Sequence, residues 1–250
     1  MKIIGSDYDG TLNHGGIDEE KKDAIKKWRK KGNVFSVVSG RGKRELYEIY
    51  KDKDFECDYL VADNGAVIMK PDGEIVCNTK CDGEILNSLC EFLFEVGCTW
   101  ADVHSDDDIM IVCDSLQAKE NEFYLKDVPR TEWFTQVSTM LETVEESEKI
   151  TCLVKEKFGE FLNPLQNGRC IDIVRHDMNK AKGMYKLASL FSLGHEDIIT
   201  VGDNINDRDM IKEFRSYAMQ SGVEEIKKIA TFVTESVADL IRKELQEQNK

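Results

Sequence analysis

Acidic residues gather at the ends of short apolar segments in this sequence of 250 residues. Asp7 and Asp9 follow the run KIIGS, and Asp203 and Asp207 follow the run DIITVG. Carboxylates concentrated in one place repel one another and resist burial, so a fold tolerates them only with a compensating cation. Oxygen-only ligands of this kind suit Mg²⁺ better than zinc. The sequence therefore predicts a Mg²⁺ site.

Two further polar groups belong to the same pattern. Ser39 follows the apolar run NVFSVV, and Lys180 and Lys182 lie near the start of a predicted helix that precedes DIITVG. Each feature alone has a simpler explanation: a DxDG turn, a helix cap in GDNIND, or a solvated lysine. Ligands of open α/β sheets collect at the carboxyl ends of the strands, and all these groups follow strands or accompany them. Their joint occurrence favours one site for a metal and a phosphate.

Strands alternate with helices at both ends of the chain. KIIGSD, NVFSVVSG and DYLVADNGAVI read as buried strands, and the helices IDEEKKDAIKKWRKKG and KRELYEIYKDK lie between them. In the first helix Asp18 is the predicted N-cap, and Gly32 ends it. The same alternation returns in the last third of the chain. We predict an α/β fold with a doubly wound, parallel, Rossmann-like sheet.

The middle of the chain follows a different pattern. We predict a helix at GEILNSLCEFLFEVG, strands at DIMIVCD, KITCLVKE and RCIDIVR, and a helix or turn at FGEFLNPLQNG. This combination indicates a small α+β domain inserted into the first one. We therefore expect a discontinuous core domain formed by residues 1–80 and 171–250, and an inserted cap domain formed by residues 81–170.

The negative charge of the protein is concentrated in this insertion. Residues 81–170 contain 19 acidic and 7 basic residues, a formal charge of −12 out of −14 for the whole chain. Such a surface argues against nucleic acid as a partner, because phosphate backbones are bound by basic surfaces. The simplest interpretation is a solvated acidic surface that maintains solubility.

Composition places further limits on the protein. No apolar run approaches the roughly 20 residues needed to span a membrane, and the N-terminus is too short and acidic for a signal peptide. We therefore expect a cytoplasmic protein with no membrane contact, as a monomer or weak homodimer. The eight cysteines form no CxxC pair and accompany no histidines at zinc spacing, so we predict reduced, mostly buried thiols.

These motifs together resemble the haloacid dehalogenase superfamily, in particular its Cof-type, sugar-phosphatase-like branch, in which the cap lies between the second and third motifs. The first motif is DYDGT (residues 7–11), the second SGR (residues 39–41), and the fourth GDNIND (residues 202–207). Lys180 matches the third motif, with Lys182 as a competitor because the chain reads KAKG. ADNGAVI and SYAMQSGVEEIKKIA also look like this branch.

The resemblance implies phosphate-ester hydrolysis through an aspartyl-phosphate. Asp7 would attack phosphorus. Asp9 would protonate the departing alkoxide and then deprotonate the attacking water. Mg²⁺ would be held by Asp7, the Asp9 carbonyl and Asp203, with Asp207 a ligand through water or a supporting partner.

The remaining site residues would hold the phosphate or the substrate. Ser39 and the Gly40 amide would bind a phosphoryl oxygen, and Lys180 would balance charge on Asp7 and on the transferring group. The residues implied in substrate binding are Thr11, Gly40, Arg41, Asn64 and Asn206.

The expected substrate is a small phosphomonoester, such as a sugar phosphate or a similar metabolite. Because the cap of this family contacts the leaving group, cap acids that face the substrate, such as the run Asp106–Asp108, would favour a neutral or cationic leaving group. Two alternatives to a phosphatase stay open at this point. One is a phosphomutase of the same superfamily, and the other is a non-catalytic protein that binds phosphometabolites.

Overall fold

The computed structural model describes residues 1–53, 55–112, 122–127 and 131–248. The chain divides into two compact units. Unit 1 consists of Met1–Cys77 and Lys180–Lys250, and unit 2 consists of Asn78–Asn179. Each unit has its own sheet and its own apolar core.

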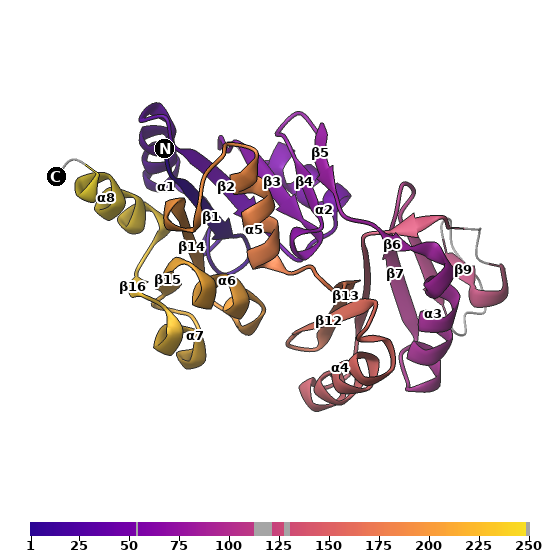
Figure 1. The fold of residues 1–250 in the computed structure, drawn as a ribbon. Coiled ribbons are helices and arrows are strands. Elements are labelled where there is room, and N and C mark those ends of the chain that lie inside the picture. The colour runs from indigo at the N-terminus through magenta and orange to yellow at the C-terminus, as the bar shows by residue number, and fades with distance from the viewer. Residues whose placement is uncertain (54, 113–121, 128–130, 249–250) are drawn as a thin grey trace. The chain divides into compact units, whose positions relative to one another are not determined.

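Unit 1 is built on a sheet of eight described strands (Figure 1). Its central strands are short apolar runs in which every residue is buried, as expected for a sheet covered on both faces. All determined pairings are parallel except that of β3 with β4. In spatial order the strands are β16 (Phe232–Thr234), β15 (Arg215–Met219), β14 (Ile198–Gly202), β1 (Ile3–Asp7), β2 (Val34–Val38), β3 (Tyr59–Ala62), β4 (Val67–Met69) and β5 (Ile75–Asn78).

Helices cover both faces of this sheet. Because successive strand residues point to opposite faces, Ile4 packs with Trp28 and Leu240 on one face, whereas Ile3 packs with Met184 and Met210 on the other. The predicted doubly wound α/β core is therefore confirmed. The helices are α1 (Glu19–Lys30), α2 (Lys43–Lys51), α5 (Lys180–Ser189), α6 (Arg208–Glu213), α7 (Glu224–Ile229) and α8 (Val237–Glu247).

Unit 2 is an α+β unit with two helices packed on its larger sheet. Residues from α3 (Leu86–Glu95) and α4 (Val144–Phe158) share one apolar core with the sheet. The order of the larger sheet is β12 (Leu162–Asn167), β13 (Cys170–Arg175), β11 (Gln136–Met140), β7 (Trp100–His104), β8 (Ile109–Val112) and β9 (Glu122–Tyr124); β10 (Trp133–Phe134) pairs separately with β6 (Cys81–Asp82).

Short 3₁₀ helices complete both units. They are η1 (Asp63–Gly65), η2 (Gly83–Ile85), η3 (Leu125–Asp127), η4 (His195–Asp197) and η5 (Ile205–Asp207). Among the described residues, no helix is both long and apolar enough to cross a membrane.

The structure differs from the sequence-based description of the insertion in three places. KITCLVKE, predicted as a strand, lies in α4, and β12 occupies much of the segment predicted as a helix or turn. We also placed the second domain boundary after residue 170. In the structure β13 pairs with β11 and β12, so unit 2 continues to Asn179.

Most of the described cysteines are buried free thiols, as predicted. Cys57, Cys81, Cys90 and Cys98 are buried, whereas Cys77 and Cys170 are partly exposed. Cys152 is exposed, because it lies on the solvent side of helix α4 rather than in a strand. The eighth cysteine, Cys113, lies outside the described residues.

Candidate active site

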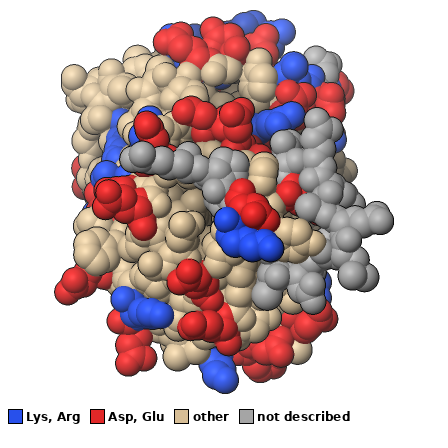
Figure 2. Space-filling model, turned by 90° about the vertical axis from the view of Figure 1, so that its right-hand side faces the viewer, with Lys and Arg blue, Asp and Glu red and all other residues tan. Residues whose placement is uncertain are grey.

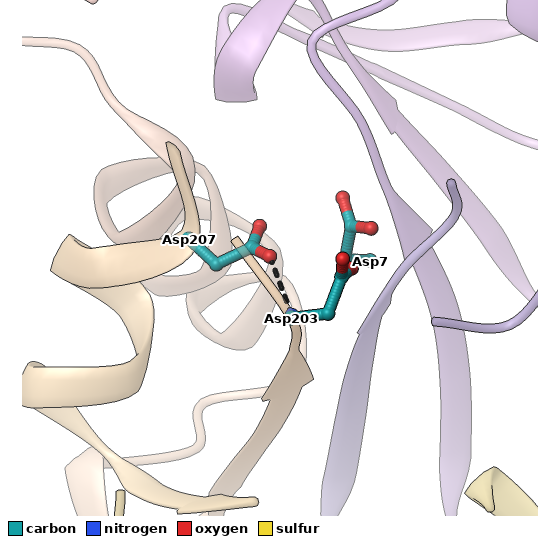
Figure 3. A group of neighbouring side chains, drawn as sticks. All are labelled: Asp7, Asp203 and Asp207. Atoms are coloured by element: carbon teal, nitrogen blue, oxygen red, sulfur yellow. Dashed lines mark hydrogen bonds between the residues drawn. The ribbon is translucent and has the colours of Figure 1, made fainter. Parts of the chain in front are cut away.

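The carboxyl ends of β1 and β14 bring three aspartates together. Since these strands are parallel neighbours, Asp7 at the end of β1 and Asp203 just after β14 meet at one edge of the sheet. Asp207 reaches the same place from η5. One carboxylate oxygen from each residue lies within 4.8 Å of the others. Figure 3 shows the three side chains converging on a common space.

Lys180 supplies a buried positive charge to this cluster. Its Nζ donates to Asp7 Oδ1 at 2.6 Å and to Asp207 Oδ1 at 2.5 Å, and its side chain is only 1% exposed. Lys182, the competing lysine, is exposed and stacks near the Tyr185 ring. The structure therefore places Lys180, and not Lys182, beside the predicted nucleophile.

One ammonium cannot neutralise three carboxylates. Burial raises the pKa of Asp7 well above its usual range, and the charge of Asp207 raises it further, although Lys180 acts in the opposite direction. Burial lowers the pKa of Lys180, but Asp207 and Asp7 outweigh that effect and raise it overall. The lysine therefore stays charged, and the cluster retains excess negative charge.

Asp207 organises the loop that follows β14. Its Oδ2 accepts from the backbone N–H groups of Asp203 at 2.9 Å and of Asn204 at 3.2 Å, and the first of these bonds is drawn in Figure 3. Gly202 makes room for this arrangement, because a Cβ there would lie 2.4 Å from Asp207 Oδ2. With both oxygens engaged, Asp207 supports Lys180 and Asp203. Asn206 is half-buried on the same turn, η5.

Residues of the first motif also hold Asp203. Thr11 Oγ1 donates to Asp203 Oδ1 at 2.7 Å, which assigns this buried hydroxyl to the cluster rather than directly to substrate. Gly10 has a φ of +79°, and a Cβ there would lie 2.5 Å from Asp203 Oδ2. Burial raises the pKa of Asp203, while Thr11, Lys180 and His14 act against that rise. A side chain at position 10 would displace the Asp203 carboxylate.

Asp9 lies apart from the buried carboxylates and pairs with Arg41. Arg41 Nε donates to Asp9 Oδ2 at 2.6 Å, and Arg41 Nη2 donates to Asp9 Oδ1 at 3.0 Å. Arg41 Nη1 also donates to Glu45. We predicted that Arg41 binds substrate, whereas the structure directs its guanidinium at two carboxylates. Glu45 was not among the predicted site residues, although its position four residues after Arg41, at the start of a predicted helix, was a usable signal.

The second motif is tied to the loop after β3. Ser39 is buried at the end of β2, and its Oγ accepts from the Arg41 N–H at 3.1 Å. Asn64 N donates to Ser39 O, and Asp63 N donates to Arg41 O, both at 3.0 Å. Asp63 and Asn64 each have a φ of +50°, a left-handed conformation that disfavours most side chains and often marks functional loops. Gly40, between Ser39 and Arg41 in the sequence, is half-buried.

The donor chemistry of the cluster fits a divalent cation. Its carboxylates are hard oxygen ligands, two of the three residues are buried, and Lys180 compensates only part of their charge. Cysteine takes no part in this cluster, so the zinc alternative has no support here. In chemical terms the site combines a buried carboxylate, a partly exposed carboxylate two residues away, and a metal-binding edge.

The chain is similar to known proteins along nearly its whole length. A family model for haloacid dehalogenase-like hydrolases matches residues 4–240. The 5-amino-6-(5-phospho-D-ribitylamino)uracil phosphatase YwtE of Bacillus subtilis is 24% identical, over 94% of this chain and 93% of that protein.

Solved structures share the fold at low sequence identity. A putative HAD/COF-like hydrolase from Plasmodium vivax superimposes with a TM-score of 0.80 at 19% identity, over 99% of this chain and 96% of that one. A HAD subclass IIB sugar phosphatase superimposes with a TM-score of 0.77 at 17% identity, over 97% of this chain and 98% of that one. These full-length matches agree with the branch inferred from the motifs.

Proposed function

The chain is a hydrolase of the haloacid dehalogenase-like family, and we propose that it is a Mg²⁺-dependent phosphatase that hydrolyses small phosphomonoesters. The observation that carries this proposal is the contact of Lys180 with Asp7, within a cluster that also contains Asp203. It unites three separate sequence motifs at the edge where two parallel strands end.

In the first step Asp7 is the nucleophile. Lys180 contacts Oδ1, so we assign the attack to Oδ2. A bond forms between Oδ2 and phosphorus as the bond from phosphorus to the leaving oxygen breaks. Asp9 gives a proton to that leaving oxygen, so the product departs as an alcohol.

In the second step water attacks the aspartyl-phosphate. Asp9 takes the proton of that water, the bond between Asp7 and phosphorus breaks, and inorganic phosphate is released. A carboxylate oxygen has two lone pairs, so contact with Arg41 leaves Asp9 the capacity to exchange a proton. Ser39 and the Gly40 amide bind phosphoryl oxygens, Lys180 balances their charge, and Asn64 and Asn206 face the substrate.

Mg²⁺ would be held by the carboxylates of Asp7 and Asp203 and by the carbonyl of Asp9, with Asp207 supporting the site. When bound, the ion supplies electrostatic shielding between the phosphate and the nucleophile. Lys180 alone provides too little positive charge for that purpose, which is why the cluster fits a metal.

The negative charge of unit 2 says little about which substrate the protein binds. Its acidic side chains lie mostly on exposed helix and turn positions, such as Glu145 and Glu148 on α4. In the run Asp106–Asp108, Asp106 and Asp107 are exposed, and Asp108 accepts from the Ser105 N–H within its own turn. Figure 2 shows acidic side chains dispersed over one face of the molecule instead of gathered in a patch. Solvent screens such charges, so they discriminate weakly between leaving groups.

The proposal is tested by phosphate release from p-nitrophenyl phosphate and a panel of metabolite monophosphates, with Mg²⁺ and with a chelator. The panel includes a phosphorylated ribitylamino compound, because the relative YwtE is named for one. Asp7→Asn is the test variant, and Asp23→Asn, at an exposed position of α1, is the matched control.

We expect activity in wild type and Asp23→Asn that needs Mg²⁺, and none in Asp7→Asn. A wild type that is inert toward the whole panel would contradict the phosphatase proposal. Equal activity of wild type and Asp7→Asn would instead contradict the choice of nucleophile.

A further inference from the structure

A buried lysine stands at the start of helix α1, where helix electrostatics disfavour it. Lys21 lies in the first turn, three residues after the N-cap Asp18, and is only 5% exposed. The N-terminus of a helix carries partial positive charge, and an ammonium resists burial. A residue that contradicts both preferences needs a compensating contact, and such exceptions are expected mainly at functional or strained sites.

The ammonium of Lys21 holds the loop that follows the first motif. Its Nζ donates to the carbonyl oxygens of His14 at 2.9 Å and of Gly16 at 2.6 Å. Gly15, between these acceptors, and Gly16 itself have φ values of +68° and +97°, and a Cβ at either position would meet no atom within 4 Å. Glycines in open space leave a loop many alternative conformations, so the two hydrogen bonds from Lys21 select one of them.

This loop is continuous with the proposed acid and base. Asn13, directly before His14, forms a β-bridge with Asp9, and its N–H donates to Tyr8 O at 2.8 Å. Leu12 N donates to Asp7 O at 3.1 Å, so the turn from residue 7 to residue 13 is closed by backbone bonds. Thr11, directly before this loop, donates from Oγ1 to Asp203 Oδ1 at 2.7 Å. The loop is therefore joined to Asp9 through Asn13 and follows directly on the residue that holds Asp203.

We propose that Lys21 is a positioning residue, which fixes the loop Leu12–Ile17 and through it the orientation of Asp9. Its effect on catalysis rests on the proposed function, because Asp9 must be the proton donor for Lys21 to act through it. Its effect on the loop rests on the hydrogen bonds alone. The two effects need separate measurements.

The first measurement is hydrogen exchange of the backbone amides of residues 9–17, with and without Mg²⁺. Lys21→Met keeps a long, unbranched side chain but removes its hydrogen-bond donors. Lys22→Met is the matched control, since Lys22 pairs with the exposed Glu19 on the same helix. We expect exchange of this segment to rise about tenfold in Lys21→Met and to stay at the wild-type rate in Lys22→Met, because two hydrogen bonds are lost. Equal exchange in the two variants would overturn the proposal, whether or not the protein has activity.

The second measurement compares leaving groups. An alkyl phosphate needs a proton from Asp9 as its alkoxide departs, whereas p-nitrophenolate departs with little help. We expect kcat for an alkyl phosphate to fall about tenfold in Lys21→Met, with kcat for p-nitrophenyl phosphate within about twofold of wild type. Lys21→Arg, which can still donate to both carbonyls, should restore the ratio.

Each remaining outcome has one meaning. If both substrates slow equally in Lys21→Met, the lysine has only a structural role and the positioning proposal is wrong. If wild type hydrolyses neither substrate, the proposed phosphatase function fails, while the exchange rates still decide whether Lys21 holds the loop. If Lys21→Met does not fold, Lys21→Gln takes its place in both measurements.

Discussion

The site contains two groups of opposite charges in contrasting surroundings. The buried cluster consists of Lys180 with Asp7, Asp203 and Asp207, and the lysine side chain is 1% exposed. The rim pair consists of Asp9 and Arg41, whose side chains are 51% and 33% exposed. Buried charges that lose a partner destabilise a protein strongly, whereas exposed pairs contribute little to stability. We therefore expect changes in the buried cluster to alter folding and chemistry together, and changes in the rim pair to alter chemistry alone.

Asp7→Asn should show the largest effect and should change activity and stability in opposite directions. We expect turnover to fall by at least about a thousandfold, because the nucleophile is lost. The metal-free protein should become more stable at neutral pH, because burial and the charge of Asp207 raise the pKa of Asp7 and so disfavour its charged form. Turnover assays and chemical denaturation in a chelator measure the two effects.

Whether the charge of Asp7 causes this difference in stability is tested by the pH dependence of the free energy of unfolding. With a folded-state pKa above the unfolded value of about 3.9, Asp7 binds its proton more tightly in the folded protein. The free energy of unfolding of the metal-free wild type should therefore fall as pH rises above about 4 toward the folded pKa. Asp203, whose pKa is also raised, adds a slope of the same sign. Equal slopes in wild type and Asp7→Asn would show that Asp7 does not titrate in this way.

Lys180→Met should destabilise the fold as well as stop the chemistry. Removing the ammonium leaves Asp7 and Asp207 buried without their shared partner, which should lower the free energy of unfolding by about 3–5 kcal/mol in the absence of metal. Mg²⁺ should recover part of that loss, because a cation again lies among the carboxylates. Lys182→Met, at an exposed position, is the control and should behave like wild type. A Lys180→Met protein as stable as that control would refute the description of the buried cluster.

Arg41→Ala tests the rim pair, and it should lower kcat while leaving the free energy of unfolding almost unchanged. We expect kcat to fall about tenfold, because Asp9 loses two oriented hydrogen bonds, while the free energy of unfolding changes by less than about 1 kcal/mol. Arg41→Lys keeps the charge but not the two-pronged contact, so it should restore only part of kcat. Full activity of Arg41→Ala would show that Asp9 needs no support from Arg41.

Glu45→Gln should show the smallest effect. Glu45, in the first turn of α2, contacts Arg41, which lies just before the helix, and such exposed pairs contribute less than about 1 kcal/mol. We expect kcat to change by less than about twofold, and any change to disappear as ionic strength rises, because salt screens exposed charges. A tenfold loss of kcat would instead place Glu45 beside Arg41 in the support of Asp9.

The sequence predicted unit 1 well because its local signals agree with its tertiary structure. β1, β2 and β14 are short apolar runs that end in polar residues, and the N-cap at Asp18 starts α1 as expected. Parallel pairing then brings Asp7 and Asp203 together from opposite ends of the chain. The contact between Arg41 and Asp9 could not be predicted, because it depends on side-chain directions in two separate loops.

Two segments of unit 2 were assigned to the wrong element for identifiable reasons. The run ITCLV is mostly apolar and rich in β-branched residues, which favours a strand, but the Thr143–Glu146 capping box starts helix α4, and Ile150, Val154 and Phe158 are buried at helical spacing. Pro164 disfavoured a strand at β12. Because β12 lies at the edge of its sheet, it tolerates a residue without an N–H group. The helix cap and the longer apolar period decided the first case, and the position at the edge of the sheet decided the second.

The pairing of β1 with β14 also has a consequence for how the protein assembles. These strands lie before and after the whole of unit 2, so their pairing closes a very long loop, whereas β7 with β8 and β12 with β13 join sequence neighbours. Long-range closure is slow, so we expect unit 2 to fold early and the β1–β14 contact to form late. Asp7 and Asp203 belong to the two sides of that contact. Affinity for a divalent metal should therefore arise only in the final folding phase, and a newly made chain should lack it until β14 has been synthesised.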